Sequence, residues 1–146
     1  MRIVTGSDHG GLSLKLALVE RLRVQGHQVE DVGSHDSDSC DYPDYAIAAC
    51  ASITAGKADF GLLVCGTGQG MAMTANRMPG VRAAVVGDTF TARATRQHND
   101  ANVVCLGARV VGPGLAADIV DAFLGTAFEG GRHEARIAKF AKLERR

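Results

Sequence analysis

The 146 residues, 46% of them apolar, are enough to bury one hydrophobic core and too few for two domains of ordinary size. Sixteen basic residues balance sixteen acidic ones, so the sequence lacks the positive charge that nucleic-acid-binding and membrane-surface proteins use. We therefore expect no nucleic-acid or membrane partner, and expect a small molecule or another protein chain instead.

The location expected from the sequence is the cytoplasm. The chain runs from Met1 directly into a strand-like segment at 2–5, without a charged leader followed by an apolar stretch. No segment approaches the roughly 20 apolar residues that a membrane-spanning helix needs. The four cysteines form no close pairs, which favours reduced thiols.

Short β-branched apolar runs alternate with amphipathic or alanine-rich segments along the whole chain. The apolar runs predict strands at 2–5, 29–32, 60–65, 81–86 and 103–106. The other segments predict helices at 12–22, 45–55, 71–76, 89–98, 113–124 and 132–142. Because parallel strands need crossover helices, the alternation predicts a single α/β domain over 1–146, a three-layer α/β/α Rossmann-like domain with a five-stranded parallel sheet.

Ligands of such sheets bind outside the carboxyl ends of the strands, so the segments that follow strands are candidate sites. Three segments carry unusual residues: 6–11 after the first strand, 65–70 after the third strand, and 97–100 at the end of the fourth helix. We expect these three segments to converge on one rim of the sheet.

The segment after the third strand reads Cys65-Gly66-Thr67-Gly68-Gln69-Gly70. Its glycines let backbone N–H groups approach a ligand, and a helix N-terminus follows, so the loop is predicted to bind an anion. It lacks the Lys-Ser/Thr pair of a P-loop and the arginine of a cysteine-based phosphatase loop. A helix N-terminus also favours the thiolate of a nearby cysteine, so this cysteine is a candidate base beside an oxyanion site. The alternative is a buried structural cysteine.

The last predicted helix carries positive charge where the helix dipole disfavours it. Arg132 and Arg136 are one turn apart near its start, with His133 between them, and Gly130 and Gly131 before them let the chain bend. The two guanidinium groups are therefore a candidate phosphate clamp. The alternative is a solvated basic face of the helix.

Four further residues each have two interpretations. His98 exchanges protons near neutral pH, which suits acid–base work on a sugar ring oxygen, but histidines at helix ends also bind free carbonyls. Asp8 and His9 lie in a glycine-flanked turn and are candidates to bind hydroxyl and phosphate groups, or the aspartate stabilises the turn. Tyr42 either bonds a substrate or begins the second helix. No spacing of His, Cys and carboxylate residues predicts a metal site.

Taken in order, the short motifs resemble those of the ribose-5-phosphate isomerase B family, which also includes allose- and galactose-6-phosphate isomerases. The motifs are Ser7-Asp8-His9-Gly10-Gly11, Asp41-Tyr42-Pro43, Cys65-Gly66-Thr67-Gly68-Gln69-Gly70, Ala75-Asn76-Arg77, Arg96-Gln97-His98-Asn99-Asp100, Gly107-Ala108-Arg109 and Glu129-Gly130-Gly131-Arg132-His133. The resemblance covers essentially the whole chain. It implies an isomerase without metal or coenzyme that forms a homodimer or a dimer of dimers, with active sites at the subunit interface.

The resemblance also implies a role for each site residue. Cys65 moves the proton between C1 and C2 of the sugar, and Thr67 with the 66–70 loop stabilises the enediolate. His98 opens the sugar ring, assisted by Asp8. The implied substrate-binding residues are His9, Tyr42, Gly66, Gly68, Gly70, Asn99, Arg109, Arg132, His133 and Arg136.

Within that set, the resemblance implies that Asn99 and Tyr42 bind sugar oxygens and that the other side chains surround the phosphate. The helix at about 132–142 is expected to contribute to the phosphate site and to the dimer interface. One branch of the family lacks the cysteine and carries a glutamate at the position of Met71, so this chain resembles the cysteine branch.

The favoured hypothesis is isomerisation of ribose 5-phosphate and ribulose 5-phosphate. Its rivals are the same chemistry on allose 6-phosphate, galactose 6-phosphate or a tetrose 4-phosphate, because the sequence does not give the distance between the base and the phosphate clamp. A protein of another class, a catalytically silent phosphosugar-binding subunit, would need the clamp but not Cys65, Thr67 and His98 together.

Overall fold

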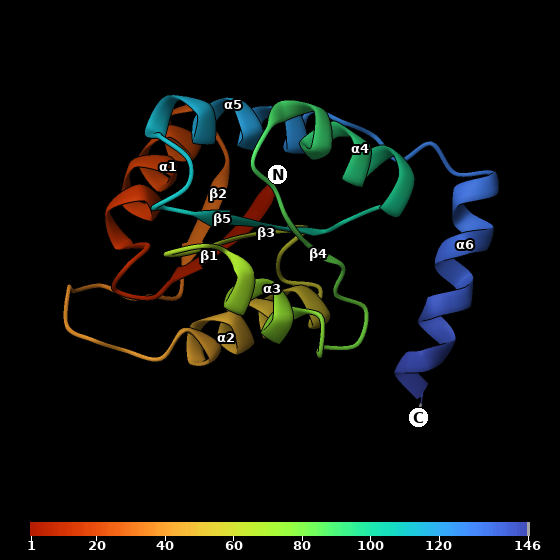
Figure 1. Ribbon diagram of the computed structural model, residues 1–146, viewed down its shortest axis with the longest axis horizontal. Coiled ribbons are helices and arrows are strands. Elements are labelled where there is room, and N and C mark those ends of the chain that lie inside the picture. The colour runs from red at the N-terminus through yellow and green to blue at the C-terminus, as the bar shows by residue number, and fades with distance from the viewer. Residues whose placement is uncertain (146) are drawn as a thin grey trace.

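Five parallel strands form a sheet at the centre of the molecule (Figure 1). The computed structural model describes residues 1–145. The strands are β1 (Arg2–Ser7), β2 (Gln28–Asp31), β3 (Phe60–Cys65), β4 (Ala83–Val85) and β5 (Val103–Gly107), in the spatial order β2-β1-β3-β5-β4. Every pairing between these neighbours is parallel. The predicted α/β fold with a five-stranded parallel sheet is confirmed.

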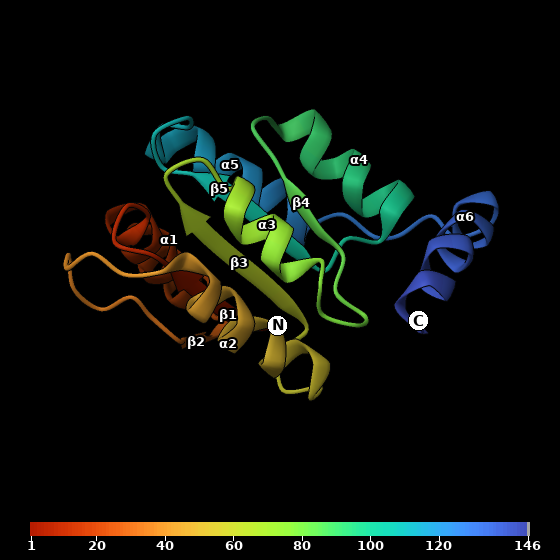
Figure 2. The ribbon, with the colours of Figure 1, turned by 60° about the horizontal axis from the view of Figure 1, so that its bottom comes forward.

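Helices cover both faces of the sheet. They are α1 (Leu12–Val24), α2 (Tyr42–Thr54), α3 (Gln69–Ala75), α4 (Thr89–Asn99), α5 (Pro113–Leu124) and α6 (Arg132–Ala141), which continues into a 3₁₀ turn at Lys142–Arg145. Helices α1, α4 and α5 lie on one face, α2 and α3 lie on the other, and α6 stands to the side, beyond the end of α4 (Figure 1, Figure 2). Within the described part of the chain, no helix has the length and apolar character to span a membrane.

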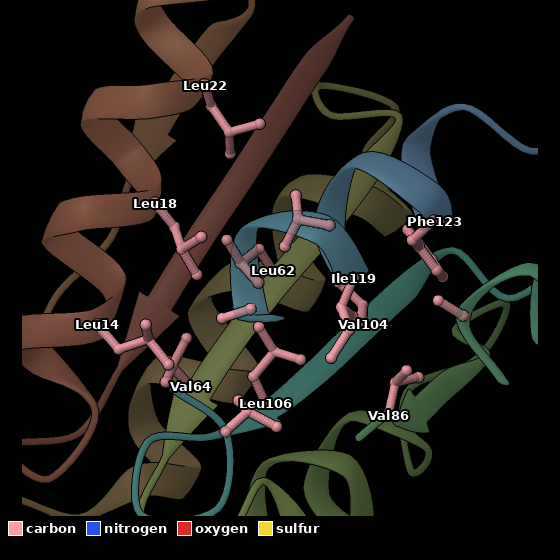
Figure 3. Packing of buried hydrophobic residues seen from close by; sticks show 14 of the residues in the cluster. Leu14, Leu18, Leu22, Leu62, Val64, Val86, Val104, Leu106, Ile119 and Phe123 are labelled. Atoms are coloured by element: carbon pink, nitrogen blue, oxygen red, sulfur yellow. The ribbon is translucent and has the colours of Figure 1, made fainter. Parts of the chain in front are cut away.

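Two apolar clusters, one on each face, hold the three layers together. Leu14, Leu18 and Leu22 follow helical spacing along α1 and pack on the first face, where Leu62 of β3 meets them (Figure 3). The next residue, Leu63, belongs to the second cluster because successive strand side chains point to opposite faces. Truncating a fully buried leucine such as Leu62 to alanine would cost about 2–5 kcal/mol of stability.

Two element boundaries differ from the sequence prediction. Helix α2 begins at Tyr42 rather than at 45, because Pro43 fits the first turn of a helix, where its missing N–H is not needed. Strand β4 has three residues rather than the six expected, because the Arg82 N–H donates to the Asn102 side chain at 2.8 Å before the ladder with β5 begins.

The strand order creates one crevice. From β1 the chain moves outward to β2, whereas β3 leads to β5 and β4 on the other side. The carboxyl ends of β1 and β3 therefore flank the point at which the strand order reverses. Open parallel sheets bind their ligands at this position.

Candidate active site

The loops that follow β1 and β3 meet at this crevice. A Cβ added to Gly10 would lie 3.7 Å from the Gly66 nitrogen, so the two loops are in direct contact. The Gly11 N–H donates to Asp8 Oδ1 at 3.0 Å, so the aspartate does stabilise the turn. His9 beside it is exposed and able to meet a ligand.

Cys65 ends β3, with only 5% of the residue exposed. Its Sγ accepts a hydrogen bond from the Gly68 N–H at 3.0 Å. This bond holds the sulfur against the glycine loop. Gly68 has a φ of 79°, a left-handed conformation that glycine adopts without steric cost, and this conformation turns the loop back toward the thiol. Thr67, between them, is exposed.

Tyr42 and Arg109, two of the predicted substrate-binding residues, lie against the same glycine loop. A Cβ added to Gly70 would come within 2.6 Å of the Tyr42 ring. A Cβ added to Gly66 would lie 3.6 Å from the Arg109 side chain. Tyr42 therefore both begins α2 and faces the crevice, so its two interpretations are compatible.

Two further cysteines, Cys50 and Cys105, are also buried. Burial raises the pKa of Cys50 to about 11. Burial also raises the pKa of Cys105, which is completely enclosed, well above its ordinary value. Both thiols are therefore protonated at neutral pH and are packing groups.

His98 and Asn99 lie at the opposite edge of the sheet, so the expectation that segment 97–100 joins the same rim is wrong. A helix between parallel strands must return the chain to the edge from which the strands start, and α4 ends just before β5 begins. The five residues of β5 span about 13 Å. Cys65 pairs with Gly107, at the far end of that strand. In Figure 2 the arrow of β3 points away from α6 and from the end of α4.

Helix α6 carries Arg132, His133 and Arg136 to this amino edge, beside the end of α4. The imidazole rings of His98 and His133 stack, with centroids 4.4 Å apart and planes 13° apart. His133 is buried, and burial together with the nearby His98 and Arg132 lowers its pKa. Arg132 and Arg136 are exposed, and the Arg136 guanidinium has no hydrogen-bond or ion-pair partner among the described residues. Arg136 is therefore free to bind an anion, Arg132 is exposed although its Nε donates to His133 Nε2 at 3.5 Å, and the ring of His133 supports His98.

His98, Glu129 and His133 also form a cluster of possible metal ligands that no sequence spacing had indicated. Their ligand atoms lie within 4.8 Å of one another. Two histidines and a carboxylate are a donor set that zinc accepts. The stacked rings, however, direct their in-plane lone pairs side by side rather than toward a common point, and Arg132 Nε lies 3.5 Å from His133 Nε2. The geometry suits ring support better than metal coordination.

Asp100 is a supporting residue to which sequence reasoning gave no role. It has a φ of 46°, which is uncommon for a residue other than glycine, and ends α4 directly after His98 and Asn99. Its carboxylate pairs with Arg82 at 2.9 Å and with Arg96 at 2.7 Å. This network fixes the end of α4 and hence the direction of the two polar side chains before it. The signal in the sequence was an aspartate at the expected helix end.

Comparison with known proteins agrees with this fold. Residues 3–140 match the family model described as Ribose/Galactose Isomerase. The chain belongs to this family, and it is an enzyme of the sugar-phosphate isomerase class.

Individual relatives indicate which kind of sugar-phosphate isomerase the chain resembles. The chain is 43% identical to ribose-5-phosphate isomerase B of Escherichia coli (strain K12) over 145 residues, which cover 99% of this chain and 97% of that protein. The structure of Clostridium thermocellum ribose-5-phosphate isomerase B matches with a TM-score of 0.98 and 46% identity, over 99% of this chain and 98% of that one. The Mycoplasma genitalium enzyme of the same name, with ribulose 5-phosphate bound, matches with a TM-score of 0.95 and 42% identity, over 99% and 96% of the two chains.

Proposed function

We propose that this chain interconverts ribose 5-phosphate and ribulose 5-phosphate through an enediolate, with Cys65 as the base. The observation that carries the proposal is the Cys65 thiol, held by the Gly68 N–H beside a glycine loop at the switch point of the sheet. The similarity to the Mycoplasma enzyme, which holds ribulose 5-phosphate, supports a pentose as the substrate.

The chemistry needs one proton to move from C2 to C1 and one from O2 to O1. The Cys65 thiolate takes the proton from C2, which leaves an enediolate, and the thiol then returns it to C1. Backbone N–H groups of the 66–70 loop and the Thr67 hydroxyl stabilise the charge that develops on oxygen. All atoms and electrons remain in the sugar, so the step is balanced without an oxidant.

The remaining roles in the proposal are those that the resemblance to the family implies, except for His133. His98, assisted by Asp8, opens the sugar ring: the C1 hydroxyl loses its proton, the bond between C1 and the ring oxygen breaks, and the ring oxygen takes up a proton. The sugar oxygens are bound by Tyr42 and Asn99, and the phosphate is bound by His9, Arg109, Arg132 and Arg136. The buried ring of His133 supports His98 rather than contacting the phosphate.

One chain cannot bring these groups around one small sugar, because Cys65 and His98 lie at opposite edges of the sheet. A two-fold partner solves this, since the amino edge of one chain can face the carboxyl edge of the other. The proposal therefore includes a homodimer, or a dimer of such dimers, in which each site is shared by two chains and α6 lies at the interface.

The test of the proposal is an assay of purified protein on ribose 5-phosphate and on allose 6-phosphate, with Cys65→Ala alongside. Turnover of the pentose should fall by about a hundredfold or more in Cys65→Ala, because the base is lost, while equilibrium binding of ribulose 5-phosphate persists. Cys105→Ala removes a buried thiol from the same apolar cluster and should retain turnover. Near-normal activity of Cys65→Ala would refute the assignment, and preference for the hexose would keep the chemistry and change the substrate.

The role of His98 has its own test, because only one of the two substrates forms a ring. Ribulose 5-phosphate has no free hydroxyl on C5 and cannot close a furanose ring. His98→Asn should therefore impair turnover of ribose 5-phosphate about a hundredfold and turnover of ribulose 5-phosphate far less. Equal losses in the two directions would show that His98 does not act on the ring.

A further inference from the structure

A lysine lies completely buried beneath the loop that follows β2. Lys15 of α1 has no exposed surface. Its ammonium pairs with Asp31 Oδ1 at 2.6 Å and donates to the Ser34 carbonyl at 2.8 Å. Burying a charge is costly even when it is paired, and an apolar side chain of the same length is often as stabilising in such a position. A role beyond stability is therefore worth seeking in what the ammonium holds.

The ammonium holds the junction between this loop and the end of β1. The Ser7 N–H donates to the Gly33 carbonyl and the Ser34 N–H donates to the Ser7 carbonyl, each at 2.6 Å. The Gly33 N–H in turn donates to Asp31 Oδ1 at 3.1 Å, the oxygen that Lys15 also binds. The junction lies one residue before Asp8, where the candidate active site begins.

The far end of the same loop touches His9. The Cys40 N–H donates to His9 Nδ1 at 3.2 Å. A ring nitrogen that accepts a hydrogen bond carries no proton, so in the neutral ring the proton is on Nε2. Within the loop, the Ser34 hydroxyl donates to the Asp36 carbonyl at 2.7 Å. Residues 33–40, which we call the β2–α2 bracket, thus connect the buried ammonium to the imidazole.

We propose that Lys15 is a positioning residue: it anchors the β2–α2 bracket, and the bracket holds His9 as the Nε2–H tautomer, whose free N–H donates to an anionic oxygen of the substrate. The inference rests on the proposed function, which assigns His9 to the phosphate. It adds the tautomer of His9 and the ring nitrogen that donates to the substrate. It also names Lys15, which lies outside the crevice, as the residue that controls both. A purely structural Lys15 would change stability but not the state of the imidazole.

The test uses the double variant Lys15→Met with Asp31→Asn, which removes both charges together and leaves neither unpaired. Imidazole ¹⁵N NMR of the full chain should give the Nε2–H tautomer for His9 in the wild type and a mixture of tautomers in the double variant. The KM for ribulose 5-phosphate should rise roughly tenfold, as expected for loss of one hydrogen bond to a charged group, with kcat changed less than about twofold. Val120→Ala, a core truncation in α5, is the control for lost stability and should change neither the tautomer nor the KM.

An unchanged His9 tautomer and an unchanged KM in the folded double variant would overturn the proposal. If the double variant does not fold, Ser34→Ala decides in its place, because it keeps the Lys15 ion pair and removes the bond to Asp36 inside the bracket. The same two changes are expected from it, and their absence would overturn the proposal equally. The wild type could also fail to turn over any phosphosugar while the His9 tautomer still changes in the double variant. That result would refute the proposed function and leave the link between Lys15 and His9 intact.

Discussion

Gly70→Ala should separate activity from stability in this enzyme. Gly70 is the second residue of α3, and a Cβ there would lie 2.6 Å from two carbons of the Tyr42 ring. Carbon atoms in favourable contact are about 3.5–4.0 Å apart, so the ring must move by about 1 Å. Tyr42 is 39% exposed and can move toward solvent without disturbing the core.

A displacement of about 1 Å at a group that positions the substrate can reduce kcat/KM by as much as roughly a hundredfold, or about 2.7 kcal/mol. We expect a loss of tenfold or more for Gly70→Ala. The stability should hold or rise, because alanine is favoured over glycine inside a helix by up to about 1 kcal/mol.

The assay combines steady-state kinetics on ribose 5-phosphate with thermal unfolding. Gly114→Ala is a matched control, since Gly114 is also the second residue of its helix, α5, and a Cβ there would meet no atom within 4 Å. It should keep full activity. The reasoning is refuted if Gly70→Ala retains its kcat/KM, or if its loss adds fully to that of Tyr42→Ala rather than overlapping with it.

Two further expectations concern α6. Arg136→Ala should raise the KM for the phosphosugar roughly tenfold with little change in kcat, because a charge-assisted bond to phosphate is lost. Lys139→Ala on the same helix is the control and should change neither constant. An unchanged KM for Arg136→Ala would show that Arg136 does not bind the phosphate. Burial holds the pKa of His133 below its ordinary value, so the unfolded chain binds more protons than the folded one below about pH 6.5, and stability falls as the pH decreases from 7.5 to 5.5. Thermal unfolding at the two pH values should show that His133→Phe loses less stability between pH 7.5 and 5.5 than the wild type, whereas the control His35→Gln loses as much. An equal loss of stability in His133→Phe would contradict this reasoning.

Much of the fold could be predicted because the spacing of apolar residues along the sequence indicates which side chains are buried. The apolar run that ends at Cys65 and the helix 113–124 have the bounds that the pattern indicated. The start of α2 was missed because the pattern does not reveal that Pro43 lies inside the first turn. The length of β4 was missed because side-chain bonds, which leave no periodic signal, replace strand pairing at its start.

The positions of the candidate residues in the fold were predictable only in part. The glycine loop and the Asp8 turn follow strands, so the rule of the carboxyl edge placed them correctly. His98 lies in the last turn of a helix, and the same topology that brings strand ends together sends helix ends to the other edge. Lys15 was overlooked because a charged residue on a helix is usually solvent-exposed, and only the structure reveals the carboxylate and the carbonyl beneath it.

In the proposed dimer, the separation of Cys65 from His98 across the sheet also makes activity depend on the concentration of the enzyme. A site made of two halves of different chains exists only while the chains are associated, so the number of working sites follows the law of mass action. Dilution below the dissociation constant of the pair would remove activity from chains that are still folded, and restoring the concentration would return it. In the proposed dimer, catalysis is therefore a property of two associated chains rather than of one.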